Sequence, residues 1–429
     1  MFWLKLGFIS FGGPAGQIAI MHQELVERRR WISEKRFLHA LNYCMVLPGP
    51  EAQQLATYLG WMMHGTAGGV MAGGLFVLPS LLLLIILSWL YVAMGDLPIL
   101  AGLFFGIKPA VTVIVAHAAH RIGTRALKNR LLWAIAAGSF VAIFALKIPF
   151  PAIVAAAALI GYFGGPLAPS QFNLGASHDS QTKSYGPALI DDQTPSPPHA
   201  LFSTSRLLRV LLVGSLLWAI PMALLTLAFA WNHPLTQMGW FFTKAALLTF
   251  GGAYAVLPYV YQGAVDHYKW LSPSQMIDGL ALGETTPGPL IMVVAFVGFL
   301  GGYQQAVFGP GNLLLAGAVA ACVVTWFTFL PSFLFIFAGG PLVESTHNDL
   351  KFTAPLTAIT AAVVGVILNL ALFFGYHVLW PQGLGASLDW PSLLIALGAA
   401  IALFYFKRGV MQVIGVCALA GLSFKLLGL

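Results

Sequence analysis

The residues of this chain that could carry chemistry occur twice, in the same order and at the same spacing. The first set comprises a lysine, a glycine pair and a proline-flanked glycine, at Lys5, Gly12-Gly13 and Pro48-Gly49-Pro50. A shift of 239 positions finds the same residue types at Lys244, Gly251-Gly252 and Pro287-Gly288-Pro289. A shift of 252 positions then aligns Pro79-Ser80 with Pro331-Ser332. The chain therefore contains two copies of one unit.

These residue types suit the binding of a small oxyanion. Glycine pairs and Pro-Gly-Pro interrupt helices, and the helix that resumes after an interruption exposes N–H groups and the positive end of its dipole. Lys5 and Lys244 each precede a glycine pair, where an ammonium group could offset the charge of a bound dianion. Two other roles stay open: the glycine pairs could serve close helix packing, and the lysines could extend to the membrane surface.

Further polar residues lie beside the interruptions. Those whose amide or hydroxyl groups suit an oxyanion or a neighbouring helix are Asn42, Gln53, Gln54, Thr285 and Thr286. Glu51 and Glu284 repel an anion unless they are protonated or paired, so we predict that they couple protons or pair with a lysine. Lys108 precedes Pro109 in the middle of an apolar segment, and its counterpart is Thr360. We predict that Lys108 contributes to substrate binding in one copy only.

Composition places the chain in a membrane. Of its 429 residues, 59% are hydrophobic and 8% are charged, whereas soluble domains are about 25% charged. The net charge of +7 fits basic cytoplasmic loops and does not require nucleic acid. The three cysteines are scattered, no histidines have metal-ligand spacing, and no nucleotide-binding or hydrolase motif occurs. We therefore predict a transporter, with no cofactor and no metal, rather than an enzyme.

Several apolar stretches are long enough to cross a bilayer, which takes about 20 residues. They lie at 67–94, 98–120, 131–147 and 149–166 in the first copy, and at 311–340, 353–378, 390–406 and 409–428 in the second. An extra span is predicted at 207–231, and a polar linker at 167–205 precedes it. The predicted domains are residues 1–166 and 206–429.

Four more segments are interrupted at a glycine pair or at Pro-Gly-Pro: 2–20, 37–64, 240–258 and 276–302. Basic residues gather at 27–36 and 121–130, so both loops are predicted to be cytoplasmic. An even number of crossings must separate them, which requires 37–64 to re-enter. The counterparts of these loops have no net positive charge and belong outside, and the extra span supplies the inversion. We predict an all-α polytopic membrane protein with an inverted-topology internal repeat and broken or re-entrant helices.

Three stretches, Lys5–Ile18, Leu47–Tyr58 and Leu248–Gly252, resemble the signature of the chromate ion transporter family. The resemblance covers nearly the whole chain outside 167–205. It implies a long-chain, two-domain member that exports chromate across the bacterial inner membrane and confers chromate resistance, with sulfate as an isosteric ligand. The partners expected are chromate, sulfate, the lipid bilayer and, in a homodimer, a second copy of the chain. A full span precedes the second copy, so the repeat also predicts a short helix upstream of Phe2.

Two alternatives to chromate export stay open at this stage. One is transport of sulfate or another oxyanion, directed inward and coupled to protons through Glu51 or Glu284. The other is a passive channel. An embedded reductase would need redox-active cysteines, a flavin motif or haem ligands, and the sequence arranges none of these. Export needs no ATPase, because moving two negative charges out of a cell at 100 mV, interior negative, releases roughly 4–5 kcal/mol.

Overall fold

The computed structural model describes residues 2–11, 13–95, 97–172, 185–195, 197–345 and 353–427, and the regular elements of this part are helices. The first copy contains α1 (Phe2–Ile9), α2 (Gly13–His22), η1 (Gln23–Arg28), α3 (Glu34–Val46), α4 (Glu51–Met94), α5 (Pro98–Ala126), α6 (Arg130–Phe144) and α7 (Phe150–Leu167). The short α8 (Pro169–Phe172) and the long α9 (Thr204–Phe229) follow. The second copy contains α10 (Pro234–Leu247), α11 (Ala253–Tyr261), η2 (Gln262–His267), α12 (Pro273–Thr285), η3 (Leu290–Met292), α13 (Val293–Gln304), η4 (Pro310–Asn312), α14 (Leu313–Ser345), α15 (Thr353–Leu379), α16 (Trp390–Ala400), η5 (Ile401–Tyr405) and α17 (Val410–Leu426).

The two copies correspond element by element. Both contain a π-helical segment after the second helix, at η1 and η2. Ser33 and Ser272 then cap α3 and α12 at equivalent positions, each accepting a hydrogen bond from a backbone N–H three residues on. The long α4 is kinked at Gly65, where φ is 63°, so its first part matches α13 and its remainder matches α14. The internal repeat predicted from the residue pattern is thus confirmed in the backbone.

The interruptions fall where glycine and proline predict them. In the first copy α1 ends at Ile9 and α2 begins at Gly13, and in the second α10 ends at Leu247 and α11 begins at Ala253. Both Pro-Gly-Pro motifs separate one helix from the next, because proline lacks the N–H that an α-helix requires.

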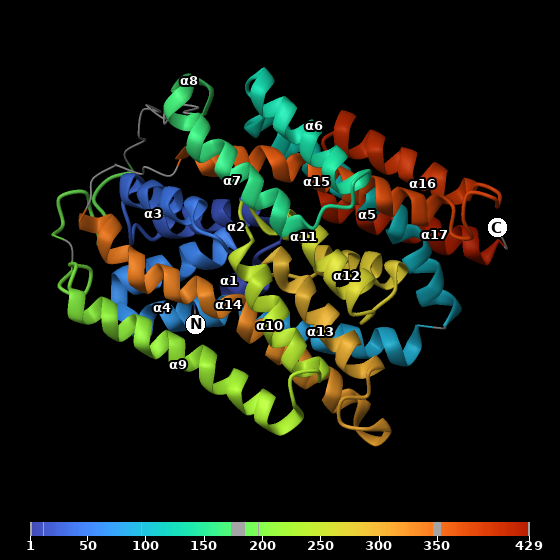
Figure 1. Cartoon of the computed structure of the whole chain (residues 1–429), viewed down its shortest axis with the longest axis horizontal. Helices are drawn as coiled ribbons and strands as arrows, with labels where there is room; N and C mark the ends of the chain where they lie inside the picture. Colours follow the sequence, from blue (N-terminus) through green and yellow to red (C-terminus); the bar gives the residue numbers. More distant parts are fainter. Residues whose placement is uncertain are drawn as a thin grey trace.

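Each copy contributes its last two helices to the other copy. Helices α6 and α7 pack against α15, whereas α16 and α17 pack against α5. Figure 1 shows α16 and α17 beside α5, with α9 along the opposite edge of the molecule. The exchange is reciprocal, as an approximate two-fold relation between the copies requires. The copies therefore share one interlocked helical body.

Substitution at one glycine tests this interlock. A Cβ atom at Gly106 of α5 would lie 1.9 Å from the carbonyl oxygen of Cys417 in α17. We expect Gly106→Ala to force the two helices apart, at a cost of about 1–3 kcal/mol, and to lower the melting temperature of the detergent-solubilised protein. Gly138→Ala in α6 is the control, because nothing lies within 4 Å of its Cβ position. Equal melting temperatures for the two variants would contradict the close α5–α17 contact.

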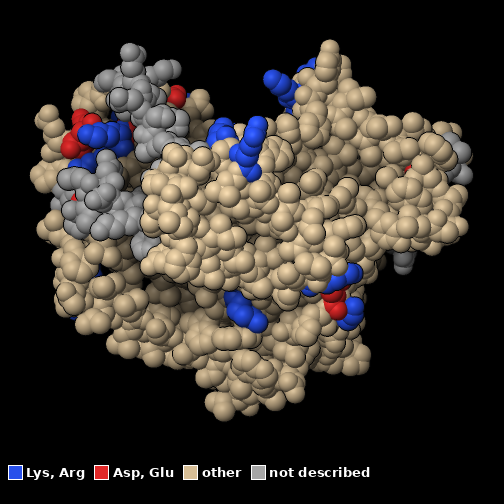
Figure 2. Space-filling model, turned by 45° about the horizontal axis from the view of Figure 1, so that its top comes forward, with Lys and Arg blue, Asp and Glu red and all other residues tan. Residues whose placement is uncertain are grey.

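The chain is an all-α, multi-pass membrane protein, as predicted. Six helices of the described part are long and apolar enough to cross a bilayer: α4, α5, α7, α9, the α14 segment from Pro310 to Glu344, and α15. Many large apolar side chains are exposed on the helix surfaces, among them Leu227 of α9 at 84%. Figure 2 shows a face on which charged side chains occur only in small groups. Lipid contact accounts for an apolar surface of this extent.

Contacts between distant segments agree with the predicted sides of the membrane. Counting crossings from the two cytoplasmic loops places the loop before 149–166 and the loop after 240–258 outside. These two loops meet where the Phe150 N–H donates to Gln262 Oε1 at 3.2 Å. Two predicted cytoplasmic segments meet where Arg36 and Glu344 form an ion pair at 3.6 Å. The inverted orientation of the second copy is consistent with both contacts.

Part of the predicted linker is ordered on the first copy. Ile190 forms an isolated parallel bridge with Ile32, and the Ser33 hydroxyl donates to Asp192 Oδ1 at 2.5 Å. The His199 ring nitrogen Nε2 lies 2.8 Å from the Trp61 carbonyl oxygen. The described part of the linker therefore packs against the first copy, in part against the basic 27–36 loop.

Candidate functional site

The two Pro-Gly-Pro turns have a backbone conformation that glycine alone adopts easily. The φ angles of Gly49 and Gly288 are 128° and 107°, in a region that L side chains avoid. The flanking prolines fix the chain on either side and leave the turn without further N–H donors. Each turn thus presents one glycine N–H at a fixed position.

Each glycine N–H binds the glycine-pair interruption of the other copy. The Gly49 N–H donates to the Thr249 carbonyl oxygen at 2.7 Å, and the Gly288 N–H donates to the Ser10 carbonyl oxygen at 2.8 Å. Thr249 is the counterpart of Ser10 under the shift of 239 positions that relates Gly288 to Gly49. The two hydrogen bonds are therefore the same interaction exchanged between the copies.

A serine from each long helix completes the same arrangement. A Cβ atom at Gly49 would lie 2.5 Å from Ser332 Oγ of α14, and one at Gly288 would lie 2.7 Å from Ser80 Cβ of α4. These serines are the repeated pair that follows Pro79 and Pro331. We call the assembly the central junction; its members are Ser10, Gln17, Gly49, Gln54, Ser80, Thr249, Gly288 and Ser332.

The central junction contains buried polar atoms without hydrogen-bond partners. Gln17 donates through Nε2 to the Gly288 carbonyl oxygen, and Gln54 donates to the Pro48 carbonyl oxygen at 2.8 Å. Among the described residues, the buried oxygens of the junction that lack a partner are Ser10 Oγ, Gln17 Oε1, Gln54 Oε1, Ser80 Oγ and Ser332 Oγ. Buried polar groups are normally hydrogen-bonded. Ser332 lies at the Gly49 turn, and Ser10 and Ser80 lie at the Gly288 turn. Their unpartnered hydroxyls can instead donate to a polar ligand.

The glycine pairs leave open space beside the backbone. Gly13, Gly251 and Gly252 have φ angles of 72°, 78° and 95°, and nothing lies within 4 Å of a Cβ atom built on Gly13. Gly12 lies outside the described residues. A Cβ atom at Gly252 would have Glu51 Oε1 at 4.0 Å as its neighbour. The first turn of α4 and the start of α11 therefore face each other.

The second carboxyl group, Glu284, also lies next to α11, close to the second glycine pair. It accepts a hydrogen bond from the hydroxyl of Tyr254 in α11, and the positive charge of Arg121 in α5 acts on both groups. Glu51 and Glu284 thus flank the second glycine pair, although neither has a glutamate as its counterpart in the other copy. This position next to the open backbone suits the coupling role that we predicted for both residues.

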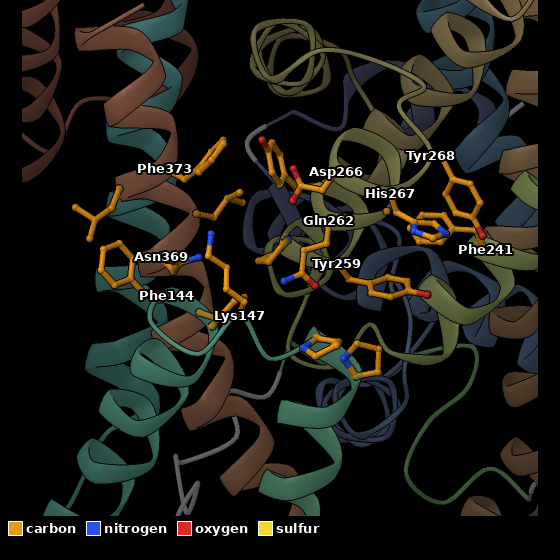
Figure 3. A pocket seen from close by; sticks show the side chains of 18 of the residues that line it. Phe144, Lys147, Phe241, Tyr259, Gln262, Asp266, His267, Tyr268, Asn369 and Phe373 are labelled. Carbon is orange, nitrogen blue, oxygen red and sulfur yellow. The ribbon is translucent and has the colours of Figure 1, made fainter. Parts of the chain in front are cut away.

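Lys244 lies apart from the junction, in a pocket of about 850 Å³. We call this pocket the lateral pocket; it is lined by residues of α10, α11, η2, α15 and the α6–α7 loop. Figure 3 shows Lys147, Gln262, Asp266 and Asn369 around the same space. Thr249 of the junction follows Lys244 by five residues, which is about 7 Å along a helix axis.

The lateral pocket suits an anion. Lys147 and Lys244 line the pocket together with one carboxyl residue, Asp266. The Lys244 ammonium group lies 5.6 Å from the centroid of the Trp240 ring. Burial raises the pKa of the Asp266 carboxyl above its ordinary range, although the charges of Lys269, Lys147 and His377 act in the opposite direction. Gln262 and Asn369 add amide donors.

The remaining predicted site residues lie elsewhere. Lys5 on α1 and Asn42 on α3 are exposed. The hydroxyls of Thr285 and Thr286 donate to carbonyl oxygens in the last turn of α12, at 3.0 Å and 3.2 Å, so they act within their own helix. Gln53 donates to Thr57 Oγ1 at 2.9 Å. The junction thus contains both Pro-Gly-Pro turns and Gln54.

Lys108 is paired rather than free. Its ammonium group lies 3.4 Å from Asp278 Oδ2 in α12 and donates to Ser274 Oγ at 2.6 Å. Asp278 was not among the predicted site residues.

Five polar members of the junction were not predicted from the sequence: Ser10, Gln17, Ser80, Thr249 and Ser332. Ser80 and Ser332 were visible as a repeated Pro-Ser pair, and Ser10 and Thr249 stand directly before the Phe-Gly-Gly repeats. Gln17 has no such signal, because its counterpart is Val256. A search for polar residues that repeat between the copies would therefore have found all of them except Gln17.

Two interlocked copies with broken helices that meet at a buried polar junction define a secondary membrane transporter. The chain belongs to the chromate transporter family, whose model matches residues 1–162 and 236–422, one segment in each copy. The resemblance seen in the glycine and proline motifs is thereby confirmed.

Relatives cover nearly the full chain. A chromate transport protein of Pseudomonas aeruginosa is 32% identical over 98% of this chain and 90% of its own length. A chromate transport protein of Cupriavidus metallidurans is 29% identical over 98% and 91%, and a probable chromate transport protein of Synechococcus elongatus is 28% identical over 99% and 94%. No solved structure matches the chain.

Proposed function

We propose that this protein is a secondary transporter that carries chromate out of the cytoplasm by way of the central junction. Supporting this proposal are the reciprocal Gly49–Thr249 and Gly288–Ser10 hydrogen bonds, which hold two turns from opposite copies around unpartnered serine hydroxyls. Chromate is a small tetrahedral dianion that accepts hydrogen bonds through four oxygens. Membership of the chromate transporter family points to the same substrate.

Hydroxyl and backbone donors bind a tetrahedral anion through hydrogen bonds that are charge-assisted, and these are stronger than neutral ones. The lateral pocket supplies the next position on the path, where Lys147 and Lys244 receive the anion before release. Several of its lining residues, among them Lys147, Gln262 and Asp266, lie at the predicted outer side. Sulfate has the same shape and charge, so the same donors would bind it.

The membrane potential supplies the driving force in this proposal. Each dianion that leaves a cell at 100 mV, interior negative, releases roughly 4–5 kcal/mol. Glu51 and Glu284 flank the second glycine pair and are the candidates for proton coupling in the alternative, inward mode. A passive channel is the other alternative. Saturation of the flux separates carrier transport from a channel.

The test is uptake of labelled chromate and sulfate into everted membrane vesicles that contain the protein. Uptake into everted vesicles corresponds to export from cells. We expect saturable chromate uptake that increases when the vesicle interior is made positive, and competition by unlabelled sulfate. Vesicles without the protein are the control. Absence of potential-dependent chromate uptake would refute the proposal, and uptake that never saturates would favour a channel.

A further inference from the structure

A charged cluster joins the two copies away from the central junction. Lys108 of α5 lies 3.4 Å from Asp278 Oδ2 of α12, and Tyr91 of α4 donates its hydroxyl to the same oxygen at 2.8 Å. Lys108 also donates to Ser274 Oγ at 2.6 Å. An ion pair inside membrane helices is costly to insert and usually marks a functional site.

The carboxyl group of this cluster is buried and incompletely paired. The Asp278 side chain is 3% exposed, whereas the Lys108 side chain is 28% exposed. Among the described residues, Asp278 Oδ1 has no hydrogen-bond partner. A buried carboxylate that loses its cation is left uncompensated, and protonation removes that cost. The Lys108 side chain can move toward the surface at which it is exposed, whereas the Asp278 side chain stays buried.

Few other groups act on Asp278. The charged or titratable ones are Lys108 from α5 and Tyr91 from α4. Phe296 of α13 packs against the Tyr91 ring, with 5.4 Å between the ring centroids. In the described parts of α13, α15 and α17, which also pack against α12, no charged group acts on Asp278.

The cluster occurs in one copy only. Under the two shifts, the counterparts of Lys108, Asp278 and Tyr91 are Thr360, His39 and Val343. The central junction, in contrast, is repeated in both copies. The two copies therefore differ in charge at this position, whereas they share the junction.

The cluster is connected to the substrate site through α12. Asp278 precedes the end of α12 at Thr285 by seven residues, about 10 Å along the helix axis. The turn that contains Gly288 follows directly. Movement of this turn on anion binding is therefore transmitted along a rigid helix to Asp278.

We propose that Asp278 is a proton-binding site and that anion binding at the central junction, transmitted through α12, separates Asp278 from Lys108. This inference rests on the proposed transport of a dianion. When the dianion binds, movement of the Gly288 turn shifts α12 and separates Asp278 from Lys108, and Asp278 takes one proton from water on the exposed side of Lys108. When the anion leaves, the ion pair forms again and the proton is released to water. One proton then travels with each dianion, so each cycle moves one net negative charge.

The experiment uses purified protein in proteoliposomes, with chromate at alkaline pH, where it is fully deprotonated. At zero potential, a pH gradient should drive chromate into the alkaline compartment, up to about tenfold per pH unit for one coupled proton. In Asp278→Asn the pH gradient should drive no accumulation, while an imposed potential still does. Accumulation by the variant equal to that of the wild type would overturn the inference. A wild-type protein that responds to potential but not to the pH gradient would also overturn it.

A milder variant covers the case in which Asp278→Asn does not fold. Tyr91→Phe removes one donor to the carboxylate and leaves the ring packing intact. We expect its transport rate to depend on pH with a midpoint shifted to higher pH, and an unchanged midpoint would contradict the proposal. Chromate movement by the wild type under potential alone tests the proposed function separately. Its absence would refute that function, whatever the variants do.

Discussion

Gly288→Ala should abolish chromate transport while the protein still reaches the membrane. An alanine at this position must adopt a φ angle of 107°, which costs about 1–3 kcal/mol. Its Cβ atom would also lie 2.7 Å from Ser80 Cβ, and that atom is fixed to the α4 backbone. The turn can relieve the clash only by moving away from α4, which separates the Gly288 N–H from Ser10. Uptake into everted vesicles, normalised to membrane abundance, measures the effect.

The equivalent substitution in the other copy should have a smaller effect. Gly49→Ala also meets positive φ, at 128°, but its close contacts are Ser332 Oγ and the Gln54 amide, which can rotate. We therefore expect a large loss that is smaller than that of Gly288→Ala. Gly415→Ala in α17, with open space at its Cβ position, is the control and should transport normally. Normal transport by Gly288→Ala would remove the turn from the site.

The interruptions and boundaries of the helices were predictable because their causes are local. Proline removes a backbone donor wherever it occurs, and glycine permits positive φ wherever it occurs. Gly49 and Gly288 accordingly lie in the predicted interruptions, where both have positive φ. Six of the nine predicted spans match helices that are long and apolar enough to cross a bilayer. Those predicted at 131–147, 390–406 and 409–428 correspond to shorter apolar helices.

The pairing of side chains was not predictable in the same way. Lys108 was expected at the substrate, but its partner Asp278 lies 170 positions away in the other copy. Nothing in the local pattern of α5 indicates that partner. Thr286 stands beside a Pro-Gly-Pro turn, as a substrate-binding residue would. Its hydroxyl instead donates a hydrogen bond to the Gly283 carbonyl oxygen. Residue type limits what a side chain can do, whereas packing decides what it contacts.

Contacts between the two copies explain why the turns could be predicted from the sequence and why their partners could not. Repetition correctly indicated the Pro-Gly-Pro turns, whose glycine N–H groups make the same contact in both copies. It failed for Lys5, which is exposed, whereas its counterpart Lys244 lines the lateral pocket. The contacts of those turns lie across the copies, from Gly49 to Thr249 and from Gly288 to Ser10. Only the three-dimensional arrangement shows that each turn is completed by the opposite copy. The polar junction is therefore a property of the pair.

Lys244→Ala and Lys147→Ala should each reduce chromate transport by roughly 10- to 150-fold, since a hydrogen bond to a charged group contributes about 1.5–3 kcal/mol. Both side chains line the lateral pocket. Lys244→Arg keeps the charge and should recover much of the activity. Initial rates in everted vesicles at subsaturating chromate, with membrane abundance measured in parallel, provide the comparison.

Lys407 provides the matched control. It occupies the α16–α17 loop as Lys147 occupies the α6–α7 loop, and both residues have positive φ, 51° and 55°. Lys407 does not line the lateral pocket and is exposed. Lys407→Ala should therefore transport at the wild-type rate, although it removes the same charge from the same kind of loop. Equal losses in the Lys147 and Lys407 variants would show that net charge matters and the pocket does not. A loss confined to Lys147 and Lys244 would place the anion in the lateral pocket on its way out.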